Sequence, residues 1–285
     1  IPEIPHPVLS FQGEHGTAKT TAQRMTCSII DPSPVPSRKP PRDAESWVTA
    51  AAGSWVVGID NLSMIPDWLS DSICRAVTGD GDVRRKLYSD GEHHVFSFRR
   101  CICMTSIDLG TLRGDLADRL LPIRLDVIPE ESRRKDADVR AAWAAAHPKV
   151  LGALLDVGAR ALEASASIDL PRLPRRADFA EELGAVDMIL GTDGLRHYLS
   201  LSGEMARDSV LSDPFLVALA MQGEFIGTSA ELYQSLTPEK PPKDWPRDAR
   251  AVTPVLRRQA PAMRLAGWEV DDDGAHNESK VLRWT

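Results

Sequence analysis

The sequence predicts an α/β fold whose first part is a parallel sheet between two layers of helices. Apolar runs at residues 8–11, 55–60 and 101–104 are too short for helices, and helical patterns at residues 44–52 and 66–77 alternate with them. This alternation is typical of three-layer α/β proteins, because parallel strands are joined by helical crossovers.

We expect three parts along the chain. The α/β core takes residues 1–150, and a helical connection takes residues 151–222. The last part, residues 223–285, has short helices followed by two apolar runs that can pair as a hairpin, which predicts a winged-helix-like domain. Within it, Pro261 predicts a break between two short helices, since proline interrupts a helix.

The pattern is helical from residue 130 to about residue 219, and six apolar residues in it recur at helical spacing, which predicts that they face a core. They are Trp143, Val150, Leu151, Leu154, Leu155 and Leu162.

The loop after the first apolar run has the residues of a phosphate-binding, Walker A loop, and a helical segment follows it. Its glycines let backbone N–H groups face a triphosphate. Lys19 then supplies a positive charge to the β- and γ-phosphates, and the Thr20 hydroxyl can ligate Mg²⁺. We therefore predict a binding site for ATP and Mg²⁺. Its nucleotide-binding residues are Gly13, Glu14, His15, Gly16, Thr17, Ala18, Lys19, Thr20 and Thr21.

This loop departs from the usual pattern at one position, because Ala18 stands where a glycine normally precedes the lysine. An ordinary turn rich in glycine and threonine is the alternative reading of the same residues. A second nucleotide-site element favours the functional reading.

That element is the apolar run 55–60, which ends in Asp60. A buried parallel strand would deliver this carboxylate to its C-terminal edge, as a Walker B strand does. Asp60 and Thr20 are then the predicted protein ligands of Mg²⁺. The alternative is a core strand that ends in a turn-forming Asp-Asn pair.

A third apolar run, 101–104, ends in Thr105 and is followed by residues 115–119 with the sequence Asp-Leu-Ala-Asp-Arg. In this order the motifs resemble the AAA+ helicase-type ATPases of phage, plasmid and integrated-element replication proteins, which often follow a primase–polymerase domain. The likeness extends through residues 173–179 and the winged-helix-like end. It implies a sensor-1 role for Thr105, an arginine finger at Arg119, DNA as partner and a hexameric ring.

The resemblance implies the catalytic residues Lys19, Asp60, Asn61, Thr105 and Arg119, with two departures. Thr105 stands where Asn is common. Asn61 stands where AAA+ ATPases usually carry a Glu that polarises the attacking water, and an amide cannot accept a proton. Either Glu14 or Asp108 replaces that carboxylate, or Asn61 only orients the water, or the protein binds ATP and hardly hydrolyses it.

Residues 84–100 predict a hairpin, because alternating residues flank an Asp-Gly pair. In one AAA+ branch a hairpin before sensor 1 touches DNA in the pore. The segment carries five Lys or Arg residues against two acids. DNA contact by Arg84, Arg85 and Lys86 is one reading, and a solvated edge hairpin is the other.

Residues 247–264 carry five arginines and one acid, which suits phosphate contacts from a recognition helix. The predicted DNA-binding residues here are Arg257, Arg258 and Arg264. A winged helix that docks a protein is the alternative.

The composition bounds these readings. A chain of 285 residues with 42% apolar content can bury a full core, and its net charge of −7 means that DNA binding must be local. Four cysteines lack zinc-ligand spacing, so we expect core thiols and no metal beyond Mg²⁺. No apolar run is long enough to span a bilayer, and we expect a cytoplasmic protein.

The chain begins with Ile1, and its first strand starts within ten residues, so we expect a fragment. The resemblance implies a primase domain or partner upstream of it. The function expected is an ATP-dependent DNA helicase or replication ATPase. Two alternatives are a weakly or non-hydrolysing DNA-binding scaffold, and a signalling ATPase whose winged helix docks a protein.

Overall fold

The computed structural model describes residues 4–85, 93–107, 114–170, 173–174, 176–242, 244–273 and 281–284. The chain divides into two compact units. The first unit comprises Ile1–Leu109 and Arg119–Tyr198, and the second comprises Gly110–Asp118 and Leu199–Thr285.

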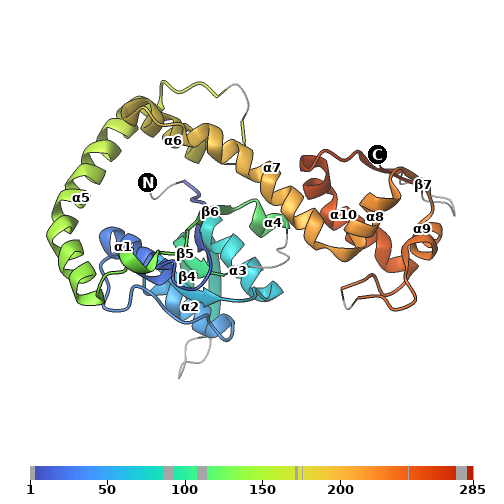
Figure 1. Ribbon diagram of the computed structural model, residues 1–285, viewed down its shortest axis with the longest axis horizontal. Helices are drawn as coiled ribbons and strands as arrows, with labels where there is room; N and C mark the ends of the chain where they lie inside the picture. The colour runs from blue at the N-terminus through green and yellow to red at the C-terminus, as the bar shows by residue number, and fades with distance from the viewer. Residues whose placement is uncertain are drawn as a thin grey trace. The chain divides into compact units, whose positions relative to one another are not determined.

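A parallel sheet of four strands forms the centre of the first unit (Figure 1). The strands are β1 (Val8–Gln12), β2 (Val56–Leu62), β5 (Cys101–Ser106) and β6 (Leu120–Arg124), in the spatial order β2-β5-β1-β6. Every neighbouring pair is parallel, which confirms the predicted parallel α/β sheet.

The two strands farthest from β6 are apolar and buried, as expected for strands covered on both faces. Val57 and Ile59 of β2 are buried, and so are Ile102 and Met104 of β5. Helix α1 (Lys19–Ile30) packs on β1, β2 and β5. This burial holds the carboxyl ends of the strands, where the polar residues Asp60 and Thr105 lie, at a fixed edge of the sheet.

Two further helices match the predicted patterns. Helix α2 (Ala44–Ala52) begins at Asp43, whose side chain accepts a hydrogen bond from the Ser46 N–H at 2.8 Å and forms a capping box with it. Helix α3 (Asp67–Thr78) follows Pro66, ends at Gly79 and packs on β5. Its buried face is long, including Leu69, Ile73 and Val77.

The predicted hairpin is confirmed as an antiparallel pair, β3 (Asp80–Arg85) with β4 (His93–Phe98). Arg84 pairs with His94 and Arg85 with His93 in the strand register. Lys86 lies outside the described residues, as do the rest of the turn and Asp108.

The helices after the sheet correct one expectation. Helix α5 (Asp136–Ser165) packs mainly on α6 (Ala177–Leu190), and α7 (Gly194–Ser212) follows. The predicted core positions Leu154, Leu155 and Leu162 are 50%, 65% and 56% exposed. The periodicity found the helix, but α6 covers only part of its apolar surface.

The second unit packs helices on a small antiparallel sheet. Its elements are α4 (Gly114–Ala117), α8 (Pro214–Gln222), β7 (Phe225–Gly227), α9 (Ser229–Leu236), α10 (Ala249–Leu265), β8 (Val270–Asp273) and β9 (Val281–Trp284). The strand order is β7-β9-β8, so the predicted terminal pairing is confirmed and β7 adds a strand that the sequence did not predict.

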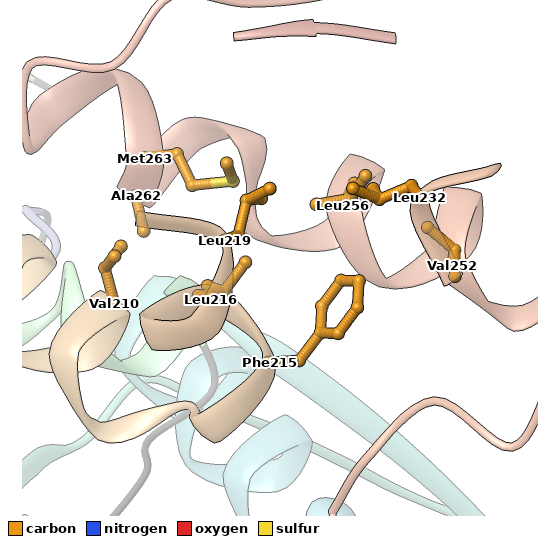
Figure 2. Packing of buried hydrophobic residues seen from close by; sticks show 9 residues of the cluster. All are labelled: Val210, Phe215, Leu216, Leu219, Leu232, Val252, Leu256, Ala262 and Met263. Atoms are coloured by element: carbon orange, nitrogen blue, oxygen red, sulfur yellow. The ribbon is translucent and has the colours of Figure 1, made fainter. Parts of the chain in front are cut away.

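One hydrophobic core joins the helices of this unit (Figure 2). Phe215 and Leu219 of α8, Leu232 of α9 and Leu256 and Met263 of α10 are buried together in it. Burial of this area is the main stabilising contribution to the unit, because apolar surface leaves water.

Helix α10 corrects the expected break at Pro261. It is one helix of 17 residues that contains both Pro254 and Pro261. Both prolines lie on the exposed side of the helix, whereas Val252, Leu256 and Met263 are buried. The carbonyls that lose a helical partner, those of Arg250 and Arg257, are thus on the side that water can reach, and the buried side holds the helix together.

Candidate functional site

The site begins at the loop 13–18, which leaves the carboxyl end of β1 and runs into α1. Gly13 has φ 154° and Gly16 has φ 85°, a region that favours glycine. A Cβ on Gly13 would also lie 2.5 Å from the carbonyl oxygen of Leu125. Glycine at residue 13 is therefore required both by the backbone conformation and by a close approach.

The backbone conformation of Ala18 shows how the loop accommodates alanine where a glycine is usual. It has φ 58° and ψ 28°, which is the left-handed conformation. A glycine would adopt this conformation freely, and for alanine it costs on the order of 1 kcal/mol. The backbone thus keeps the glycine-like geometry although the residue is alanine, and α1 begins directly after it.

Lys19 folds back over this loop. Its Nζ donates hydrogen bonds to the carbonyl oxygens of Gly13 and Glu14, each at 2.6 Å. The Thr17 hydroxyl donates to the same Glu14 carbonyl at 3.0 Å. The side chains of Glu14 and His15 are exposed. The Lys19 charge is therefore held on the inner side of the loop, and the side chains of Glu14 and His15 lie on its solvent-exposed side.

Three side chains meet at the carboxyl edge of the sheet. The Thr20 hydroxyl, one residue into α1, donates to Asp60 Oδ1 at 2.9 Å, across 40 residues of sequence. The Thr105 hydroxyl, on β5, donates to the same oxygen at 2.6 Å. Asp60 lies on β2, so the helix and two strands converge on one carboxylate. The three residues were predicted from separate motifs, and the structure brings them into contact.

Asn61 has an unusual backbone. It has φ 58°, and the register between β2 and β5 shifts between Ile59 and Leu62. Its N–H donates to Thr105 Oγ1 at 2.8 Å, and its side chain is exposed. Asparagine adopts the left-handed conformation more readily than most residues, because its short side chain can hydrogen-bond locally. This geometry favours asparagine over glutamate at the position.

The segment after β6 forms a border of the loop that sequence reasoning missed. The Leu125 N–H donates to the Gln12 carbonyl at 2.8 Å, and the Ile128 N–H donates to the Gly16 carbonyl at 3.2 Å. Val127 is 46% exposed beside this contact. No motif marks these residues, because their contacts are made by the backbone.

Arg119 lies at the opposite end of the sheet, where the strands begin. Its carbonyl accepts a hydrogen bond from the Val8 N–H at 2.7 Å, so it sits where β1 begins, and the loop 13–18 follows where β1 ends. Five residues of strand separate these edges by roughly 16 Å. The structure thus does not bring Arg119 to the Thr20–Asp60 pair of its own chain.

The arginines predicted on the last helix share one face of α10. Arg257, Arg258 and Arg264 are exposed, and Arg250, which the prediction did not include, is exposed two turns earlier on the same face. One nitrogen of Arg264 donates to the Val270 carbonyl at 3.2 Å. The first turn of α10 contains no acidic residue, so this face is basic along its length.

The thiols near the site are core groups, as expected. Cys27 of α1 and Cys103 of β5 are buried, and a hydrogen bond between them lowers the pKa of Cys27 and raises the pKa of Cys103. All four cysteines are free. In the part of the chain that the structure describes, no three His, Cys, Asp or Glu residues are grouped to hold a metal.

Comparison with protein families identifies the chain's relatives. Residues 1–208 match the family described as the actinomycete integrative conjugative element replication protein. The chain belongs to this family. Residues 215–285 match its second part, the AICE RepA C-terminal domain, which starts next to the beginning of α8. The predicted relation to replication proteins of integrated elements is thereby confirmed.

The remaining comparisons add no further relative. No curated protein and no solved structure matches the chain. Among the described residues, no helix is both long and apolar enough to cross a membrane. The three-part division at residues 150 and 222 stays a prediction.

Proposed function

We propose that this replication protein is an AAA+ ATPase that binds ATP and Mg²⁺ and uses them to act on DNA as a helicase. The hydrogen bond between Thr20 and Asp60 carries the proposal. It places a hydroxyl at the start of a helix, behind a glycine-containing loop, against a carboxylate at the end of a buried strand. P-loop NTPases hold Mg²⁺ with such a pair.

The order of the strands supports the AAA+ assignment. β5, which carries Thr105, lies between β1, which leads into the loop, and β2, which carries Asp60. AAA+ ATPases place the sensor-1 residue in the same position, between the Walker B strand and the loop. Thr105 contacts Asp60 directly, as a residue that reports on this site would.

The residues present fit ATP and Mg²⁺. Mg²⁺ usually takes only one or two protein carboxylates and completes its octahedron with phosphate oxygens and water, so it needs no acidic cluster. When bound, Mg²⁺ neutralises charge that develops on the phosphates. Lys19, which now donates to the loop carbonyls, would face the β- and γ-phosphates. Thr20 and Asp60 would hold the metal, and Thr105 would keep Asp60 oriented.

Hydrolysis is the weaker part of this activity. Asn61 cannot take a proton from the attacking water, and the backbone N–H of Asn61 is already bound to Thr105. Glu14 is exposed on the loop, so it is one carboxylate whose side chain could move toward the γ-phosphate. Slow turnover with intact binding follows, and the weakly hydrolysing DNA-binding scaffold is the alternative that Asn61 favours.

The Asn61→Glu variant is expected to change ATP turnover more than ATP affinity. A glutamate supplies the missing proton acceptor, which typically contributes 10²- to 10⁴-fold to a rate, although strain at φ 58° will offset part of the gain. Multiple-turnover hydrolysis with and without single-stranded DNA measures the effect, and calorimetry with Mg²⁺ measures affinity.

Asn61→Gly is the matched control, because glycine accepts φ 58° without strain and has no side chain to orient water. If Asn61→Gly turns over ATP as fast as the parent, the asparagine side chain has no role in hydrolysis. A parent protein that binds ATP and shows no turnover, with or without DNA, would leave the scaffold as the function.

The second unit supports DNA binding. Its element order is α8-β7-α9-α10-β8-β9, and β7 joins the terminal pair in one sheet. Winged helices have this order, with the third helix as the recognition helix. In the segment that begins at α8, the third helix is α10, whose exposed face carries Arg250, Arg257 and Arg258. From Arg250 to Arg264 the row spans about 21 Å of the helix, so it can follow a phosphate backbone over that length.

Replacing Arg257 and Arg258 together by Glu is expected to weaken binding to DNA roughly equally for all sequences, because the arginines contact phosphates and not bases. The log–log salt slope should fall by about 0.7 to 0.9 for each phosphate that the variant no longer neutralises. Fluorescence anisotropy with single- and double-stranded DNA between low and moderate salt measures both quantities.

The control is the pair Arg207→Glu and Lys240→Glu, which makes the same change in charge at exposed sites of the second unit that are not on α10. It should leave the slope close to that of the parent. Equal loss in both variants would mean that net charge alone governs binding. No loss in either would favour the protein-docking function of this unit.

A further inference from the structure

Gln23 is a polar side chain buried completely between α1 and the sheet. It lies three residues after Thr20 and four after Lys19, so the three residues share one side of α1. A buried amide is costly unless its hydrogen bonds are made. The partners of this amide therefore indicate what it holds together.

The hydrogen bonds of the Gln23 amide reach three segments. Its Nε2 donates to the carbonyl oxygens of Ile59 on β2 and Cys103 on β5, each at 2.8 Å. Its Oε1 accepts a hydrogen bond from the Ser37 hydroxyl at 2.6 Å. One amide thus ties α1 to both strands that supply the site.

These contacts fall where β2 and β5 change their register. The shift lies between Ile59 and Leu62, directly at Asp60. On the outer side of β2, the Asp60 N–H donates to the Arg38 carbonyl at 2.7 Å, one residue beyond Ser37. Gln23 therefore bonds to Ile59, which precedes Asp60 on β2, and to Ser37, which precedes the Arg38 that accepts from Asp60.

We infer that Gln23 is a positioning residue for the Mg²⁺ site of the proposed ATPase, an inference that rests on the proposed function. Lys19 is held by its own loop, which belongs to the same stretch of chain as α1. The Thr20–Asp60 pair instead joins α1 to β2, and its geometry depends on how the helix sits on the sheet. Gln23 lies one helical turn from Thr20 and fixes the position of α1 on the sheet.

This division predicts a split effect. Without the amide, α1 can shift against β2, so the contribution of Mg²⁺ to ATP affinity falls while the contribution of Lys19 remains. Gln23→Met keeps the size of the side chain and removes its hydrogen bonds. The ratio of ATP affinities with Mg²⁺ and with EDTA is expected to fall about tenfold, and the affinity in EDTA by about twofold or less.

Cys27→Ala is the matched control. Cys27 lies one turn further along α1 and is buried against the same sheet, in an apolar cluster with Phe11 and Val56. The variant should lower the thermal stability without changing the Mg²⁺ ratio. A double variant provides a second check, since Gln23→Met should change ATP affinity little once Asp60→Asn has removed the metal ligand.

The outcomes distinguish failure of the proposed ATP and Mg²⁺ site from failure of the role inferred for Gln23. If the parent binds ATP equally well with Mg²⁺ and EDTA, the proposed function fails. If the parent shows a Mg²⁺ ratio, and Gln23→Met keeps it while losing stability as Cys27→Ala does, Gln23 is only a structural residue and the inference is overturned. Should Gln23→Met not fold, Ser37→Ala decides. It frees the amide oxygen only, so a ratio lower by about two- to threefold supports the inference and an unchanged ratio overturns it.

Discussion

ATP binding is expected to be lost in the Lys19→Ala variant, with affinity falling by roughly 100-fold or more. Lys19 is the cation whose Nζ lies inside the loop 13–18, bonded to the carbonyls of Gly13 and Glu14. The variant loses the charge that we propose meets the phosphates, and it loses two hydrogen bonds to the loop. Calorimetry with ATP and Mg²⁺ measures the effect.

Arg24→Ala is the control for this experiment, because Arg24 is an exposed cation on the same helix. It should bind ATP like the parent. Equal affinity in Lys19→Ala and the parent would remove the basis of the proposed nucleotide site, since residues 13–21 contain no other lysine or arginine.

Arg119→Ala is expected to lower ATP turnover by about 10³- to 10⁵-fold while leaving ATP binding intact, if the arginine acts as a finger. The finger neutralises charge that develops only in the transition state, which explains the split between rate and affinity. Single-turnover hydrolysis, measured beside calorimetry, separates the two.

If Arg119 is an arginine finger, its position means that it acts on a neighbouring chain. It stands at the start of β6, beside the start of β1, and the loop 13–18 follows the end of β1. The separation of roughly 16 Å exceeds the reach of an arginine side chain. Each site is then shared between two chains, and a ring, most simply a hexamer, is the expected active form.

Mixing inactive chains tests the shared site. Lys19→Ala and Arg119→Ala chains together should recover part of the ATPase activity, since some interfaces combine an intact Lys19 with an intact Arg119. Lys19→Ala mixed with Asp60→Ala is the control and should recover none, because both changes damage the same side of the site. An Arg119→Ala protein with normal turnover as a monomer would show instead that Arg119 serves the surface of its own chain.

Local signals in the sequence predicted many of the individual elements, although not the strand β7 or the unbroken helix α10. The apolar runs ending in Asp60 and Thr105 predicted buried strands, because a run too short for a helix can be buried only as a strand. Helical patterns at residues 44–52 and 66–77 located α2 and α3. Periodicity did not predict which apolar residues would be covered by another element. Leu155, predicted to face a core, is exposed on α5.

The sequence by itself determined which groups are present: a lysine and a threonine behind a glycine-containing loop, one carboxylate, an asparagine in place of a glutamate, and a row of arginines. The tertiary structure decided which of them meet. It placed β5 between β1 and β2, so that Thr105 reaches Asp60, and it set Arg119 at the far edge of the sheet. It also brought Gln23 of α1, which belongs to no motif, into hydrogen bonds with both β2 and β5. The physical reason is that sequence patterns record local conformation and burial, whereas the order of parallel strands is settled by packing between segments distant in the chain.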